Sequence, residues 1–202
     1  MSTSEREIVI SYALSDSAKL GLALDVAFAF EEIRSAIIRS ALKKLEAQLK
    51  EAMGEQALEL ENQFEESLSE SYTGFLIRNR AWPEKLWLGI EAQARVARNF
   101  CIGVSSGNYE IDRNQLKADL EQGLRRPTNS TGDWISWHWL DSQPRSWDNK
   151  KILLDFFENG PAAQELVRLF KERIAIIDAW TGARRDLDDL GTGLEGSEPE
   201  LA

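Results

Sequence analysis

The sequence is poor in the residues that hold soft metal ions or form disulfides. Its 202 residues include one cysteine, Cys101, and one histidine, His138. Because a zinc site of the Cys/His type takes about four such ligands, this class of site is excluded, and we expect no bound metal. One cysteine cannot form an intramolecular disulfide, so a reducing cytoplasm is the predicted compartment. Cys101 lies in the apolar run FCIGV, which predicts a small buried side chain and not a nucleophile activated by His138.

Signals for membranes and nucleotides are missing as well. No apolar run reaches the roughly 18 residues of a membrane-spanning helix, and the start, MSTSEREIVI, lacks the pattern of a secretory signal. Gly89, Gly103 and Gly107 do not form a phosphate-binding loop, and Gly191 and Gly193 fall in a predicted tail. We therefore expect a soluble protein with no membrane partner and no cofactor.

Basic side chains are in the minority, with 24 Lys and Arg against 34 Asp and Glu and a formal net charge of -10. Phosphate backbones are held by Lys and Arg, so this balance argues against direct nucleic-acid binding. An acidic surface instead suits a protein partner with a basic surface, including a nucleic-acid-binding complex.

Most of what the sequence does contain is helical. Residues 7–14, EIVISYAL, alternate and predict a short strand, and residues 18–71 are predicted to form a helical arm. The first part of this arm, LGLALDVAFAFEEI, is apolar nearly all round, so we expect it to be buried on several sides. Further on, an apolar stripe lies on one helical face: Ile38, Leu42, Leu45, Leu49 and Met53. The stripe predicts a coiled-coil seam, either within an antiparallel hairpin or between two chains.

The last part of the predicted arm is acidic. After Gly54 it carries six glutamates without nearby cationic residues in the sequence: Glu55, Glu59, Glu61, Glu65, Glu66 and Glu70. These six residues, the acidic ridge, are predicted to lie on a helix. They form either a solvated helix face or a surface that occupies a basic cleft on another macromolecule.

A small antiparallel sheet of about three strands is predicted at residues 72–105. Residues 72–80, 85–92 and 99–105 alternate or are continuously apolar, and Trp82-Pro83 marks a turn. Helices are predicted at 112–123 with Asp112 as N-cap, from either Asp148 or Asn149 as N-cap, and from Pro161 to about Trp180. Residues 181–202 predict an acidic flexible tail. The predicted fold class is α+β, mostly helical, with residues 1–180 as one domain.

Seven tryptophans are many for a chain of this length. Trp134, Trp137 and Trp139 cannot all face one side of a regular strand, so we expect some in the core and some at the surface. In the core, they would fill the gap between sheet and C-terminal helices. At the surface, Trp134 and Trp137 would form an exposed aromatic contact for a sugar ring, a base or a partner chain.

The order of these hydrophobic features resembles a known module. A Trp-Pro turn, the strands LWLGIE and FCIGV, the WHW segment, a later Trp147 and two amphipathic helices are similar to a module that accompanies PD-(D/E)XK nuclease-like domains in prokaryotic and phage proteins. The resemblance covers about residues 75–180 and implies an accessory role. The nuclease motif needs [D/E]-x-K, and the nearest fragment here, Glu91-Ala92-Gln93, has glutamine in place of the lysine.

Three functions follow as predictions. The first is a non-enzymatic protein-binding factor, such as a phage-type inhibitor or accessory subunit, that engages a basic surface through the acidic ridge by mimicking nucleic-acid charge. The second is a degenerate Mg²⁺-dependent nuclease-like enzyme that uses Glu91 with Asp112 or another carboxylate. The third is a homodimeric scaffold built on the stripe from Ile38 to Met53. No complete catalytic motif is found, so no catalytic residue is assigned.

Overall fold

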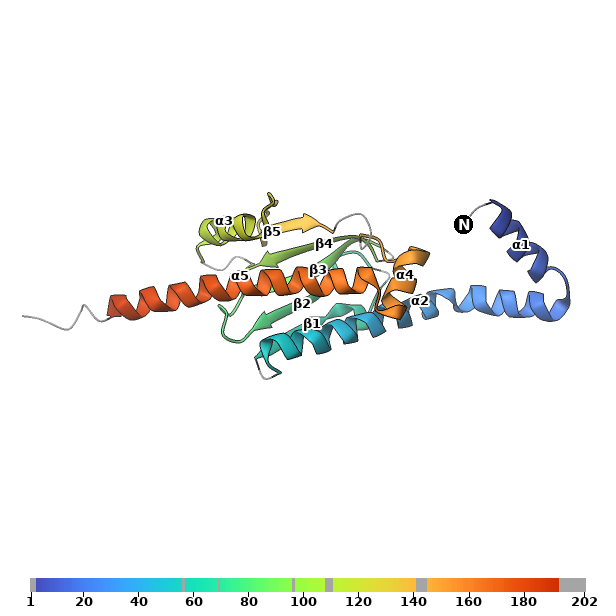
Figure 1. Ribbon diagram of the computed structural model, residues 1–202, viewed down its shortest axis with the longest axis horizontal. Coiled ribbons are helices and arrows are strands. Elements are labelled where there is room, and N and C mark those ends of the chain that lie inside the picture. Colours follow the sequence, from blue (N-terminus) through green and yellow to red (C-terminus); the bar gives the residue numbers. More distant parts are fainter. Residues whose placement is uncertain are drawn as a thin grey trace, which may run out of the picture.

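A five-stranded sheet with helices on one face forms the body of the protein (Figure 1). The computed structural model describes residues 3–55, 57–68, 70–95, 97–107, 111–140 and 145–192, with residues 3 and 183–192 described by their backbone. In this part of the chain, long helices before and after the sheet confirm the predicted α+β class.

The sheet is an antiparallel meander in which the strands follow one another in chain order. Its strands are β1 (Leu58–Asn62), β2 (Thr73–Asn79), β3 (Trp87–Ala94), β4 (Arg98–Ser105) and β5 (Trp134–Trp139). The three predicted strands correspond to β2, β3 and β4. The sheet is wider than predicted because β1 and β5 pair with its two edges.

Alternation along the strands decides which face of the sheet enters the core. On β3, Leu88, Ile90 and Ala92 are fully buried, whereas Trp87 before them and Glu91 between Ile90 and Ala92 are only half-buried. Successive side chains of a strand point to opposite faces, so the first three face the helices and the other two face away.

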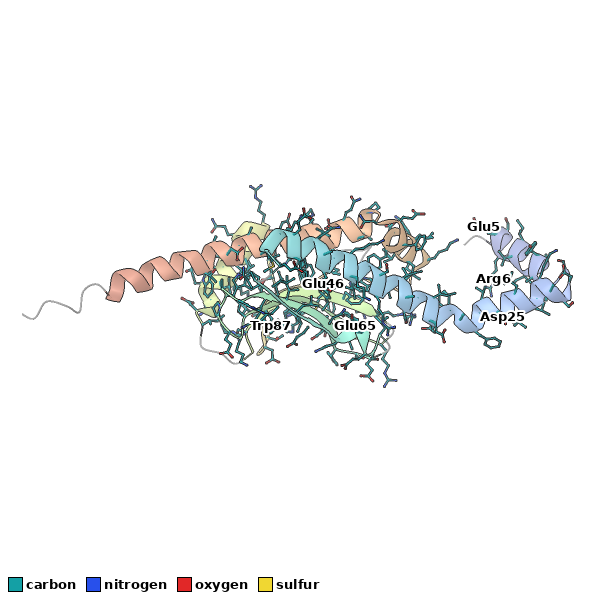
Figure 2. All side chains as sticks on the ribbon, turned by 90° about the horizontal axis from the view of Figure 1, so that it is seen from below. Glu5, Arg6, Asp25, Glu46, Glu65 and Trp87 are labelled. Carbon is teal, nitrogen blue, oxygen red and sulfur yellow. The ribbon has the colours of Figure 1, made fainter. Side chains whose placement is uncertain are left out.

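Two long helices cover the core face. They are α2 (Ser17–Met53) and α5 (Pro161–Thr192), which run in the same direction, and the short α4 (Lys150–Glu158) packs against both. Figure 2 shows α2 and α5 as one layer and the sheet as the other. The remaining helices are α1 (Thr3–Ala13) and α3 (Arg113–Leu124), and α3 packs against α5 and β5. Among the described residues, no helix is both long and apolar enough to cross a membrane.

The predicted helix starts are confirmed by their capping hydrogen bonds. The Asp112 carboxylate accepts a hydrogen bond from the Gln115 backbone N–H at 3.0 Å, and the Asn149 side chain accepts one from the Lys151 N–H at 2.8 Å. Both satisfy N–H groups that the first helical turn leaves without partners. Pro161 begins α5, where its missing N–H costs nothing.

The stripe predicted as a dimer seam lies in the core of its own chain. Ile38, Leu42, Leu45 and Leu49 are at most 4% exposed, because α2 packs there against α4, α5 and β1. The stripe was correctly placed on one helical face. Its use as a seam between two chains is wrong, because the sheet and helices already cover these side chains.

Two terminal predictions are also corrected. Residues 7–14 belong to α1 and the following turn and not to a strand. A helix satisfies its own backbone hydrogen bonds, whereas a strand needs a neighbour, and no strand of the described sheet pairs with this segment. At the other end, α5 continues to Thr192, so the flexible tail does not begin at residue 181; residues 193–202 lie outside the described residues. A helix already anchored by packing extends at low cost through good helix formers.

The acidic part of the arm is not a helix. α2 ends at Met53, where Gly54 has a positive φ of 85°, and the chain turns back into β1. Leu58 and Leu60 alternate with Glu59 and Glu61, which suits a strand, and the pairing of β1 with β2 overrides the helix preference of the glutamates.

Candidate functional site on the open sheet face

The sheet face away from α2 and α5 carries the candidate site. Side chains opposite the core face come from alternate positions, so Trp87, Glu91 and Gln93 of β3 share this face with Cys101 of β4, which is paired with Glu91. In the described part of the chain, no helix packs over this face, which we call the open face.

A β-bulge places the tryptophans of β5 on the open face. Trp139, Trp137 and Trp134 pair with Cys101, Gly103 and Ser105, which are alternate residues of β4 and therefore share a face. The register shift between Val104 and Ser105 makes Ile135 the extra residue of a bulge, which adds one position to β5. The expectation that the three tryptophans divide between two faces is therefore wrong, and all three are half-buried.

Two glycines on the open face leave room for the side chains that pack closely against them. Gly89 and Gly103 are directly paired across β3 and β4. A Cβ on Gly103 would stand 2.7 Å from Trp137 Cβ and 2.8 Å from Trp134 Cε3, and a Cβ on Gly89 would stand 2.3 Å from Leu76 Cδ2. Both positions therefore require the absence of a side chain.

The open face contains a hollow of about 290 Å³. Its lining residues come from three strands and two loops, and they are Tyr72, Glu91, Gln93, Cys101, Thr131, Asp133, Trp134 and Trp137. They supply three aromatic rings, two carboxyl groups, two hydroxyl groups, an amide and a thiol, and no lysine or arginine is among them. Since drug-sized ligands take pockets from about 300 Å³ upward, this hollow suits a side chain or a small head group.

Glu91 is the half-buried acid of the hollow. Burial raises the pKa of its carboxyl above the ordinary value; the hydrogen bond donated by Gln93 opposes this increase, and repulsion from Asp133 adds to it. Among the described residues, no cationic side chain forms an ion pair with Glu91. On the same face, Glu59 has the opposite surroundings, because a hydrogen bond from Arg78 lowers the pKa of its carboxyl.

The tryptophans of the open face differ in what lies over their rings. The Arg145 guanidinium is 4.8 Å from the ring centroid of Trp139, and that of Arg78 is 5.6 Å from Trp87. These are cation–π distances. Within the described residues, no cation lies over Trp134 or Trp137, the two rings that line the hollow with Glu91. The Trp137 indole N–H is also buried without a hydrogen-bond partner in that part of the chain.

Cys101 and His138 do not form a nucleophilic pair. Cys101 is on the open face and His138 is on the core face, because their strand partners, Trp139 and Ile102, are on opposite faces. Burial raises the pKa of the Cys101 thiol to about 12, so the thiol is protonated at neutral pH. His138 is instead in contact with the buried Arg173, whose Nη2 is 3.1 Å from its Nδ1.

The letters G-x-S-x-G occur at residues 103–107 as GVSSG. In a hydrolase, this serine stands on a strained turn between a strand and a helix. Here Ser105 is the last residue of β4, is paired with Trp134 and does not have a positive φ. The segment is therefore a strand end and does not form a nucleophile elbow.

The acidic ridge is dispersed over several segments. Glu59 and Glu61 lie on β1, Glu65 on the short 3-10 helix Gln63–Glu65, and Glu55, Glu66 and Glu70 in turns or bends. Glu59 forms ion pairs with Arg78 and Arg80, which contradicts the expectation that the ridge has no cationic partners. A continuous acidic helix is therefore a wrong prediction, although the other five glutamates are exposed.

A carboxylate metal centre is not formed by the described residues. They contain no group of three or more His, Cys, Asp or Glu side chains placed to hold a metal ion. Asp112, proposed as a partner of Glu91, caps α3, and Asp133 is the carboxylate that interacts with Glu91.

No protein-family model, curated protein or solved structure matches this chain. The resemblance of residues 75–180 to the accessory module of nuclease-like proteins therefore stays a prediction.

Sequence reasoning named Trp134 and Trp137 but missed most of the hollow. The sequence suggested Glu91 only as a metal ligand and Gln93 only as a replacement for the lysine of the nuclease motif, and it did not point to Tyr72 or Asp133. A usable signal was present on β3, where Gly89, Glu91 and Gln93 alternate with apolar residues in a central strand. Charged and amide side chains at such positions are uncommon unless the face is used.

Proposed function

We propose that this chain is a non-enzymatic protein-binding factor whose hollow receives a cationic side chain of a partner protein. One observation carries the proposal: a half-buried carboxyl, Glu91, lies beside Trp134 and Trp137, and no cation of the described residues pairs with it. Aromatic faces next to a carboxylate are the arrangement that recognises ammonium and guanidinium groups.

The chain's own arginines support this chemistry. On the same face, Trp139 and Trp87 each lie beneath an arginine of this chain, and Glu59 pairs with Arg78. The hollow has the aromatic rings and the carboxyl of that arrangement, and the described residues supply no cation to it. A guanidinium or ammonium group of a partner would pair with Glu91 and lie over an indole ring. The cation–π contact would contribute about 0.5–2 kcal/mol to the binding free energy.

The overall charge suits the same partner. The chain has a formal net charge of -10, and the negative potential of such a protein attracts a basic surface and increases the association rate. An inhibitor or accessory subunit that acts on a nucleic-acid-binding complex belongs to this class, because such complexes present arginine and lysine. A cytoplasmic location is part of the proposal, since one cysteine suits a reducing compartment.

The test titrates the whole protein with the peptides Gly-Arg-Gly, Gly-Lys-Gly and Gly-Glu-Gly, followed by tryptophan fluorescence. We expect saturable binding of a cationic peptide and none of the acidic one. Glu91→Gln should weaken binding about 10-fold or more, the equivalent of about 1.4 kcal/mol. Glu61→Gln is the matched control, because Glu61 is an exposed glutamate on the same face outside the hollow.

The pH dependence gives a second readout. Binding should decrease as the pH falls through the raised pKa of Glu91, because the protonated carboxyl no longer attracts a cation. Equal affinities for the wild type and Glu91→Gln would refute the proposal. Titration with MgCl₂ in place of peptide, with a nuclease assay, tests the enzymatic alternative in the same protein.

A further inference from the structure

The N-terminal hairpin, defined as α1 and residues 17–33 of α2, is unusually apolar at its surface. Of fifteen exposed large hydrophobic side chains in the described residues, twelve are on or directly beside this hairpin. They are Ile8, Val9, Ile10, Tyr12, Leu14, Leu20, Leu22, Leu24, Val26, Phe28, Phe30 and Ile33. The expectation that this part of the arm is buried on several sides is wrong for the single chain.

The described part of the body does not cover these side chains. α2 is one continuous helix whose second half is fixed in the core by Ile38 and Leu49. Its first half therefore projects past the end of the sheet, with α1 beside it (Figure 1). Figure 2 shows Asp25 and Glu5 in this projection, well away from the labelled sheet residue Trp87.

The exposed area is large enough for a stable interface. Phe28 is 82% exposed and Leu22 64%. With each of the twelve about half exposed, the hairpin presents on the order of 1,000 Å² of apolar surface, whereas the largest patch on a typical monomer is about 300–600 Å². Two such hairpins together would bury about the 1,200–2,000 Å² of a specific protein interface.

Apolar side chains of α2 lie on both flanks of the line through Asp25 and Glu32. Asp25 and Glu32 are seven residues apart, which places them on one side of α2 after two turns. Leu24 and Phe28 lie on one flank of this line, and Val26 lies on the other. A partner that contacts only one side of α2 would leave the apolar side chains on the other side exposed to solvent. A bundle of helices covers both sides and leaves the line through Asp25 and Glu32 in water.

The charge of the hairpin argues against a lipid surface as its partner. Residues 3–33 contain six carboxylates and two basic side chains, a net charge of -4. Helices that lie on membranes are rich in Lys and Arg, because lipid head groups are anionic.

We propose that the hairpin is a self-association surface, through which two copies of this chain form a four-helix bundle. A two-fold axis pairs the same patch with itself, so one apolar hairpin supplies both sides of the interface. This places the contact on residues 3–33 and leaves the hollow on the open face outside it.

Sedimentation velocity of the full chain, from about 1 to 100 µM, tests the proposal. We expect a dimer, and we expect Phe28→Glu to weaken it about 100-fold, because the change places a charge in the apolar contact. Phe157→Glu is the matched control: Phe157 is 68% exposed on α4, outside the hairpin, and its change should leave the dimer intact. Far-UV circular dichroism checks that each variant is folded.

Disulfide trapping provides a second measurement. Ala29→Cys puts a thiol on the hairpin, while the native Cys101 is 2% exposed and serves as a silent background. Covalent dimers on mild oxidation of this variant support the proposal. A monomer at every concentration, a dimer unaffected by Phe28→Glu, or flotation of the monomer with phosphatidylcholine–phosphatidylserine vesicles would each overturn it.

Discussion

Gly103→Ala is the substitution that tests the open face most directly. A Cβ at this position would stand 2.5 Å from the Ser136 carbonyl oxygen and 2.7 Å from Trp137 Cβ. Contacts under 3.0 Å essentially never occur for a real Cβ, and the first of these atoms belongs to the backbone of a paired strand. The methyl group therefore forces β5 to move away from β4.

The size of the effect follows from two opposing contributions. Overpacking a tightly packed site costs about 1–3 kcal/mol. Replacing glycine restricts the unfolded chain and returns about 0.4–1 kcal/mol. We expect a net loss of about 1–2 kcal/mol in the free energy of unfolding, which lowers Tm by about 2–8 °C for a chain of this size.

The assay is urea unfolding followed by tryptophan fluorescence and by far-UV circular dichroism. Gly132→Ala is the matched control, since a Cβ there meets nothing within 4 Å. The folded-state fluorescence of Gly103→Ala should also change, because Trp134 and Trp137 are displaced. A free energy of unfolding within about 0.3 kcal/mol of the wild type would refute the close approach of β5 to β4.

Three further variants test other parts of the structure. The folded state raises the pKa of the Glu91 carboxyl, so this carboxyl contributes fully to stability below its pKa in the unfolded chain, and the contribution is lost as the pH rises through its pKa in the folded chain. Glu91→Gln should therefore raise Tm at pH 7 and leave Tm unchanged near pH 4. Leu49→Ala should cost about 2–5 kcal/mol by chemical denaturation, because Leu49 is fully buried, whereas Leu154→Ala, at 48% exposure, should cost much less. Asn149→Ala should cost about 1 kcal/mol through loss of the α4 cap, and a thermal melt with no change would contradict that capping role.

Local chemistry was enough to place several elements from the sequence. The alternation of Leu88 and Ile90 with Trp87 and Glu91 predicted a strand, and that strand is β3. Asp112, and Asp148 or Asn149, predicted helix starts because a capping side chain acts on N–H groups within three residues. Such features depend on near neighbours in the chain, so no knowledge of the fold was needed.

The sequence also determined which side chains of α2 are buried, but not what buries them. The period of Ile38, Leu42, Leu45 and Leu49 marks one helical face, and a second chain or the sheet would satisfy it equally well. The strand at Leu58–Asn62 was missed for a related reason, since its glutamates favour helix in isolation and only the pairing with β2 makes it a strand.

Tertiary structure alone decided the candidate site and the exposure of the hairpin. Composition and periodicity could not reveal the bulge at Ile135, yet this one extra residue brings Trp134 to the same face as Trp137 and Glu91. A bulge depends on the register between two strands, and that register is set by contacts distant in sequence. Likewise, the apolar character of residues 20–33 is visible in the sequence, but only the path of α2 past the sheet leaves Phe28 in solvent.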